Sequence, residues 1–170
     1  ECKELLFVVE READGREPLV RCINFGLDGM QSFSFTLEEE RSAVLVPAGQ
    51  VGTYLYEPNA SVLKAGAFKQ IAVRTGVKKL QVNSHLYTAD HLVSDFPGRR
   101  FRVDEVLSFT GKLCKGLSKT IPQANITVRN FPLSVEELRK RTKITDGGHV
   151  YLFATTLVDG EKVLVKCSKA

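Results

Sequence analysis

The 170 residues of the chain are enough for one domain or two small ones with a substantial core. Apolar residues make up 43% and charged residues 26%, both close to globular averages, which argues against a disordered chain. No apolar run approaches the roughly 20 residues that cross a bilayer as a helix, and no signal-peptide pattern opens the chain. We therefore expect a cytoplasmic protein without membrane contact.

The net charge of +4 is unevenly distributed along the chain. Residues 1–98 carry 10 basic and 13 acidic side chains, a net charge of −3. Residues 99–143 carry 11 basic and 4 acidic side chains, a net charge of +7, and residues 144–170 balance at 3 and 3. Such asymmetry concerns partners rather than fold, and it predicts an anionic ligand for the second half.

The cysteines and histidines give no metal-binding pattern. Cys2, Cys22, Cys114 and Cys167 have no C-x-x-C spacing, and the three histidines complete no zinc motif. Two disulfides are conceivable, but apolar or helical surroundings favour buried, reduced thiols for most of the four.

In the first half, residues 1–9 suggest a helix that runs into a strand. Two β-rich runs at 19–25 and 31–36 predict strands separated by the turn GLDG, with both phenylalanines of the second run on one face. Residues 38–42 predict a short exposed helix or loop. The chain begins with a glutamate and its only methionine is Met30, so we expect a segment cut from a longer protein.

The next stretch contains a clear strand and helix. Residues 52–57 predict a strand, and residues 58–76 predict one helix with a proline in its first turn and a glycine at its end. Residues 78–82 predict a short strand, and residues 83–98 predict a connection that contains the boundary between two subdomains, near residue 96.

The second half predicts a βαβαββ order whose last two strands are antiparallel. Ser134 and Glu137 form a capping-box pattern at the start of the second helix, and Asp159-Gly160 is a hairpin turn signal. The fold class is therefore α+β, with two small α/β subdomains. The expected strands are 99–109, 126–129, 149–157 and 162–167, and the expected helices are 110–120 and 134–142.

The cations of this half are our candidate RNA contacts. Lysine and arginine in the last turn of a helix also offset the helix dipole, so the end of the second helix has an ordinary explanation. That explanation does not cover arginines on a strand or a lysine stripe along a whole helix, whereas a surface that neutralises phosphates does. The candidates are Arg99, Arg100, Arg102, Lys112, Lys115, Lys119, Arg129, Arg139, Lys140, Arg141 and Lys143, with Phe131 in an exposed-looking turn for base stacking.

These residues resemble a known family. The second half resembles the THUMP-like domain that closes a group of bacterial class I S-adenosylmethionine-dependent methyltransferases, in the order RRFRVDEVLSFTGKLCKGL, QANITVRNFPLSVEELRKRTKITDGGHVYLFATT and GEKVLV. The stretch before it resembles the ferredoxin-like module of the Bacteroidetes-type members, in YLYEPNASVLKAGAFKQIA. The chain start, ECKELLFVV with the strands after it, is similar to the last helix and two strands of the methyltransferase core.

The resemblance implies three parts, namely a core stub at 1–50, a ferredoxin-like module at 51–95 and a THUMP-like domain at 96–170. It implies that the full-length protein methylates RNA, such as tRNA or rRNA, with S-adenosylmethionine as cofactor. This chain would present the RNA and contact the absent methyltransferase domain. No cofactor, metal or catalytic residue is expected in the chain itself.

Two possible sites have simpler explanations. The GLDG turn lacks the helix that should follow a cofactor-binding glycine turn, and Glu57 suits a cap or salt bridge better than a ribose contact. Ser84, His85, Asp90 and His91 cluster in sequence without a nucleophile-elbow motif, so they are more readily loop residues than a hydrolase triad.

A second functional class remains open. The chain could be a docking module for the methyltransferase domain or another protein, which predicts an exposed apolar patch within residues 1–50 and binding that salt does not weaken. Such a patch could also make the isolated chain dimerise.

Overall fold

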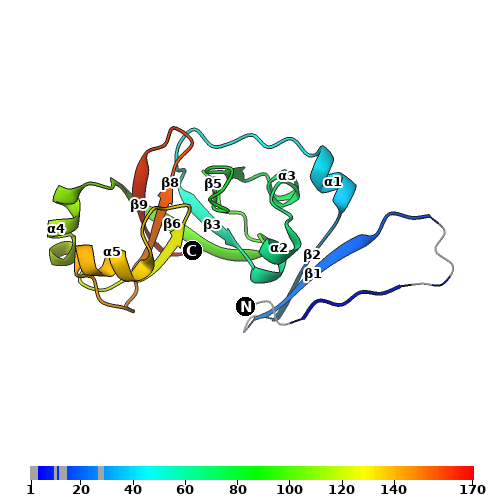
Figure 1. Cartoon of the computed structure of the whole chain (residues 1–170), viewed down its shortest axis with the longest axis horizontal. Coiled ribbons are helices and arrows are strands. Elements are labelled where there is room, and N and C mark those ends of the chain that lie inside the picture. Colours follow the sequence, from blue (N-terminus) through cyan, green and yellow to red (C-terminus); the bar gives the residue numbers. More distant parts are fainter. Residues whose placement is uncertain (1–3, 10, 12–14, 27–28) are drawn as a thin grey trace.

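The computed structural model describes residues 4–9, 11, 15–26 and 29–170, and its fold is of the predicted α+β class (Figure 1). The strands of the described part are β1 (Leu19–Gly26), β2 (Gly29–Thr36), β3 (Tyr54–Pro58), β4 (Lys78–Lys79), β5 (Tyr87–Ala89), β6 (Gly98–Ser108), β7 (Asn125–Arg129), β8 (Tyr151–Thr156) and β9 (Lys162–Lys169). Its helices are α1 (Leu37–Ser42), α2 (Ala60–Ala65), α3 (Gln70–Thr75), α4 (Gly111–Thr120) and α5 (Val135–Thr142).

One seven-stranded sheet runs through both predicted subdomains, in the order β4-β5-β3-β6-β9-β8-β7. Strand β3 pairs antiparallel with β6, from Tyr54 opposite Arg102 to Pro58 opposite Gly98. The predicted βαβαββ order with an antiparallel last pair is confirmed by β6, α4, β7, α5, β8 and β9. The sequence did not predict that this unit and the preceding module share a ladder.

The sheet curls so that its inner face encloses a core. Leu55 of β3, Phe101 of β6 and Phe153 of β8 belong to one buried cluster together with Leu80 and Leu86 from the connection between β4 and β5. Residues from both ends of the strand order therefore meet on the inner face. We call this curled sheet the half-barrel.

Helices cover the outer face of the half-barrel at two places (Figure 1). Helices α4 and α5 pack over β8 and β9, where Leu117 and Leu138 meet Leu164 in a buried cluster. Helices α2 and α3 pack at the other end, where Ile71 and Phe35 lie in a separate cluster. The β1–β2 hairpin projects from this second end, opposite α4 and α5 (Figure 1).

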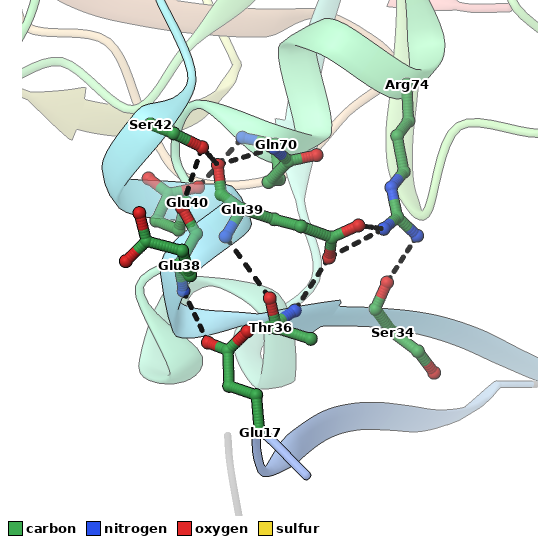
Figure 2. A network of polar contacts seen from close by, with 9 residues as sticks. All are labelled: Glu17, Ser34, Thr36, Glu38, Glu39, Glu40, Ser42, Gln70 and Arg74. Carbon is green, nitrogen blue, oxygen red and sulfur yellow. Dashed lines mark hydrogen bonds and ion pairs between the residues drawn. The ribbon is translucent and has the colours of Figure 1, made fainter.

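A polar network fastens the hairpin to helix α3 (Figure 2). The Glu39 carboxylate accepts a hydrogen bond from the backbone N–H of Thr36 at 2.7 Å and pairs with Arg74 at 2.8 Å. The Glu40 carboxylate accepts from the backbone N–H of Gln70 at 2.8 Å, and so caps the start of α3. The acidic run of α1 is therefore a structural connection between β2 and α3.

Two of the predicted elements are wrong in extent. The single helix expected over 58–76 is divided into α2 and α3, because Gly66 takes a left-handed φ of 78° and ends α2. The strand expected over 78–82 is reduced to Lys78–Lys79. The expected connection over 83–98 contains β5, whose three residues are too few for a recognisable period.

The helix and strand expected over residues 1–9 are also wrong for residues 4–9, which the structure describes. Residues 4–9 form neither helix nor strand, and Leu5 to Val9 are 69–90% exposed. Without a surface to pack against, an apolar period does not produce a stable helix. Residues 1–3 and the two central residues of the GLDG turn lie outside the described residues.

The described cysteines are as expected. Cys22, Cys114 and Cys167 are buried, and burial raises the pKa of Cys167 to about 12. Cys2 lies outside the described residues. None of the helices that the structure describes is long and apolar enough to cross a membrane.

Candidate nucleic-acid interface

Helix α4 presents the predicted lysine stripe. The Thr110 side chain caps the helix by accepting a hydrogen bond from the backbone N–H of Leu113 at 3.1 Å. Cys114 and Leu117 face the core, so Lys112, Lys115 and Lys119 lie exposed on the other side. The helical period therefore separates the lysines from the core, as the spacing predicted.

Helix α5 also has a side-chain cap at its N-terminus, a buried face and exposed cations. Its predicted capping box is present, and the hydrogen bond from the backbone N–H of Ser134 lowers the pKa of Glu137. Leu138 is buried, whereas Lys140 and Arg141 are exposed at the far end of the helix. Lys143 follows them as an exposed C-cap residue with a left-handed φ of 60°.

The two helices bring their cations to one side of the molecule. They contact each other on the same face of the sheet, and the positive charge of Arg141 acts on Cys114 of α4. Because each helix buries its sheet-facing side, its exposed cations point away from the sheet. We call the following set the helical cation surface: Lys112, Lys115, Lys119, Lys140, Arg141 and Lys143. A groove of about 520 Å³ runs beside it along α4, lined in part by Leu113 and Gly116.

Other candidates have structural contacts of their own. Arg139, whose side chain is 22% exposed, donates to the carbonyls of Ala124 and Ile144 at 3.2 Å each and pairs with Asp146. The Arg100 guanidinium donates to the carbonyl of Ser94. These side chains hold the fold together, so they are not free for a ligand as the helical lysines are.

Phe131 and Arg102 differ in exposure. The expectation of an exposed Phe131 ring is wrong, because the ring is half-buried and packs edge-on against Phe109 with centroids 4.9 Å apart. Arg102 is exposed on β6, and its register places it on the face of Arg100, as the period predicted.

Arg99 and Arg129 converge on a buried carboxylate. Glu57 at the end of β3 is only 4% exposed. One of its oxygens accepts from Nε of Arg99 at 2.9 Å, and the other accepts from Nη2 of Arg129 at 2.8 Å. The salt-bridge role expected for Glu57 is confirmed, and the bridge joins β3 to both β6 and β7.

Further contacts surround this bridge where the half-barrel opens. The side chain of Asn130, which follows β7, donates to Gln81 of the β4–β5 connection at 3.0 Å. His85 of the same connection stacks on Phe68 with ring centroids 4.0 Å apart. His85 and Asn130 both take a left-handed φ of 51°. We call the following set the sheet mouth: Glu57, Gln81, His85, Arg99, Arg129 and Asn130.

Lys79 lies buried next to His85. Its side chain is 2% exposed, and its ammonium donates to the Val82 carbonyl at 2.6 Å and lies 3.2 Å from Nδ1 of His85. The ammonium also lies 4.9 Å from the centroid of the Phe68 ring. No carboxylate of the described residues pairs with it, and burial lowers its pKa to about 8.

Replacing Lys79 with methionine is expected to change how stability depends on pH. Its pKa is about 8 in the folded chain and near the ordinary 10.5 in the unfolded chain, so the unfolded chain binds more protons between these values. Lys79 therefore makes the free energy of unfolding rise with pH across this window, and Lys79→Met removes that contribution. Urea unfolding at several pH values measures it, with the exposed Lys78→Met as control. Identical pH curves for Lys79→Met and the wild-type chain would contradict this account.

The described residues do not fit an S-adenosylmethionine site. Gly26 and Gly29 pair with each other across an antiparallel hairpin, which is not the strand–turn–helix that cradles such a ligand. Glu57 is already occupied by two arginines. The Ser84 hydroxyl donates to the Gln81 carbonyl at 3.0 Å and is buried. Among the described residues no group of three or more His, Cys, Asp or Glu side chains could hold a metal ion.

The sheet mouth could not be found from the sequence. Glu57 and Arg129 are 72 positions apart, and no local pattern indicates that the edge strand reaches across. The one local signal is the asparagine that follows Arg129, a residue that tolerates a left-handed backbone.

Two family models and one solved structure are similar to this chain. Residues 54–97 match a family model described as a ferredoxin-like domain, and residues 98–169 match one described as THUMP domain-like. A crystal structure of a "putative methyltransferase from Porphyromonas gingivalis W83" is 47% identical to this chain, with a TM-score of 0.85. The match covers 89% of this chain and 38% of the other, so the chain spans about two-fifths of that protein's length. No curated protein matches the chain. The predicted resemblance to the ferredoxin-like and THUMP-like parts is confirmed, and the methyltransferase-core stub expected at 1–50 stays a prediction.

Proposed function

Because the chain belongs to the ferredoxin-like family over residues 54–97 and to the THUMP-like family over residues 98–169, we propose that it recognises the RNA substrate of a methyltransferase. The name of the similar Porphyromonas gingivalis protein supports the methyltransferase part. The methyl transfer and its cofactor, S-adenosylmethionine, would belong to another domain of a longer cytoplasmic protein. This chain would hold the RNA, such as a tRNA or an rRNA, for that domain.

The observation that carries the proposal is the helical cation surface. Its six side chains are exposed on two adjacent helices, and no hydrogen bond or ion pair to another side chain occupies them in the described part of the chain. Cations arranged in this way neutralise phosphates of a nucleic-acid backbone and release its counterions. Such contacts position RNA without reading its sequence.

A direct test is binding of the chain to fluorescently labelled tRNA, measured by anisotropy at low salt. We expect saturable binding to the folded RNA, and weaker binding to a single-stranded DNA of equal length, because the helical surface is rigid and suits a structured backbone. If the chain binds neither nucleic acid at 50 mM salt, the proposal is wrong.

A second role, docking on a methyltransferase domain, is favoured by the β1–β2 hairpin. One face of the hairpin packs on α2 and α3, whereas Ile23, Phe25 and Met30 of the other face are 42%, 81% and 62% exposed. The register places Phe25 opposite Met30, so these side chains share a face. An apolar face of this kind fits a protein partner, in the longer protein or in a second copy, and salt would not weaken its binding.

A further inference from the structure

The sheet mouth holds two guanidinium groups in a fixed orientation. Arg99 and Arg129 each use Nε and Nη2 to reach Glu57, whose burial keeps the carboxylate in place. In the described contacts, Nη1 of each arginine donates to no other group. The arginine side chains are 53% and 39% exposed, so these remaining N–H groups are within reach of solvent. A planar guanidinium held at one edge can offer its other donors to an oxyanion at little entropic cost.

The mouth carries more positive than negative charge. Two cations, Arg99 and Arg129, share one carboxylate, that of Glu57. The Lys79 ammonium can only donate, so Nδ1 of His85 accepts and the ring proton lies on Nε2. Burial lowers the pKa of His85, and the charges of Lys79 and then Arg129 lower it further.

An unsatisfied hydroxyl lies on the same face. Thr155 of β8 is fully buried, and its Oγ1 has no hydrogen-bond partner among the described residues. Thr155 is the register partner of Arg129 in the parallel pair of β7 and β8, so both side chains leave the same face of the sheet. Buried hydroxyls are rarely left without a partner, so this one is an unmet hydrogen-bonding group beside the strand of Arg129.

We propose that the sheet mouth is a phosphate-binding site, separate from the helical cation surface. Nη1 of Arg99 and of Arg129 would donate to the phosphate oxygens, and Glu57 is a positioning residue that orients both arginines. Asn130 and Gln81 fix the edge of the mouth through their mutual hydrogen bond. The phosphate could belong to an RNA backbone, in which case the site rests on the proposed function, or to a free phosphate compound.

The test is nuclear magnetic resonance of the arginine Nε–H groups while inorganic phosphate replaces chloride at constant ionic strength. We expect saturable shifts for Arg99 and Arg129, and roughly tenfold weaker phosphate binding in Arg129→Gln, because a charge-assisted pair of hydrogen bonds is lost. Arg129→Lys keeps a cation opposite Glu57, protects the fold and is also expected to bind more weakly. Arg100→Gln is the matched control, since Arg100 points to the other face and donates to Ser94.

Further measurements distinguish an RNA backbone from a free phosphate as the ligand, and the sheet mouth from the helical cation surface. If the ligand is an RNA backbone, a hexameric single-stranded RNA without terminal phosphates should shift the same arginine resonances. If the ligand is a free phosphate compound, inorganic phosphate should shift them and this RNA should not. Reversal of the helical lysines should leave phosphate binding at the mouth unchanged, so failure of the proposed function would not remove this site. Shifts no larger than those with chloride, or equal affinity in Arg129→Gln and Arg100→Gln, would overturn the proposal.

Discussion

Changing Lys115, Lys119 and Lys140 to glutamate together is expected to lower the affinity of the chain for tRNA on the order of 100-fold at 150 mM salt. All three are exposed on the adjacent helices α4 and α5, and each would contact a phosphate. The slope of log affinity against log salt should become shallower by about 3, one for each lost phosphate contact. Fluorescence anisotropy at several salt concentrations measures both quantities.

The matched control reverses three exposed cations of the other half, Arg41, Lys64 and Lys78. It makes the same change in net charge at the opposite end of the molecule, so it should cost little affinity if the helical surface is the contact. Equal losses in both triple variants would mean that overall charge decides binding and would contradict the assignment. Arg139 is left unchanged because its carbonyl contacts hold α5 in place.

Replacing Gly98 with alanine is expected to destabilise the whole chain by roughly 3 kcal/mol, which lowers the melting temperature by roughly 6–12 °C for a protein of this size. Gly98 is the first residue of β6 and pairs with Pro58 of β3. A Cβ atom there would lie 2.7 Å from the Phe96 ring and 2.8 Å from Cα of Pro58, and would collide with the carbonyl of Glu57. The strand pair that joins the two family domains would have to separate. Thermal unfolding followed by circular dichroism measures the change.

Gly116→Ala is the control for this substitution and should have the opposite sign. Gly116 lies within α4, and a Cβ atom there would meet nothing within 4 Å. Alanine is favoured over glycine inside a helix by up to about 1 kcal/mol, so this variant is expected to be more stable than the wild-type chain. A wild-type melting temperature for Gly98→Ala would mean that the two domains do not share the β3–β6 ladder.

Local signals in the sequence predicted the THUMP-like half well. The capping box at Ser134 and the lysine spacing of α4 depend on residues three or four positions apart, and both are present in the structure. Strand β5 and the break at Gly66 were missed, because three residues carry no period and a glycine within an apolar helical pattern does not by itself end a helix.

The separation of free cations from structural ones depends on tertiary contacts. Arg139 and Lys140 are neighbours on one helix, yet Arg139 donates to two carbonyls whereas Lys140 is exposed. Arg99 and Arg129 meet at Glu57 only because the sheet curls. No pattern of residue types distinguishes these roles, since each depends on what lies next to the side chain after folding.

The shared sheet gives the chain a rigid frame with its surfaces at separate places. The helical cation surface lies at one end and the apolar hairpin face projects at the other (Figure 1). The ion bridge at Glu57 and the β3–β6 ladder connect the two family domains directly. RNA bound at one end would therefore keep a fixed orientation relative to a domain docked at the other.

The measurement that tests the central claim most directly is the affinity of the wild-type chain for tRNA, titrated from about 50 to 200 mM salt. If the six helical cations each neutralise a phosphate, affinity should fall on the order of 1,000-fold across this range. Binding that is absent at the lowest salt, or that does not change with salt, would contradict RNA recognition by this surface. The chain would then be better explained as a docking module that acts through its apolar hairpin.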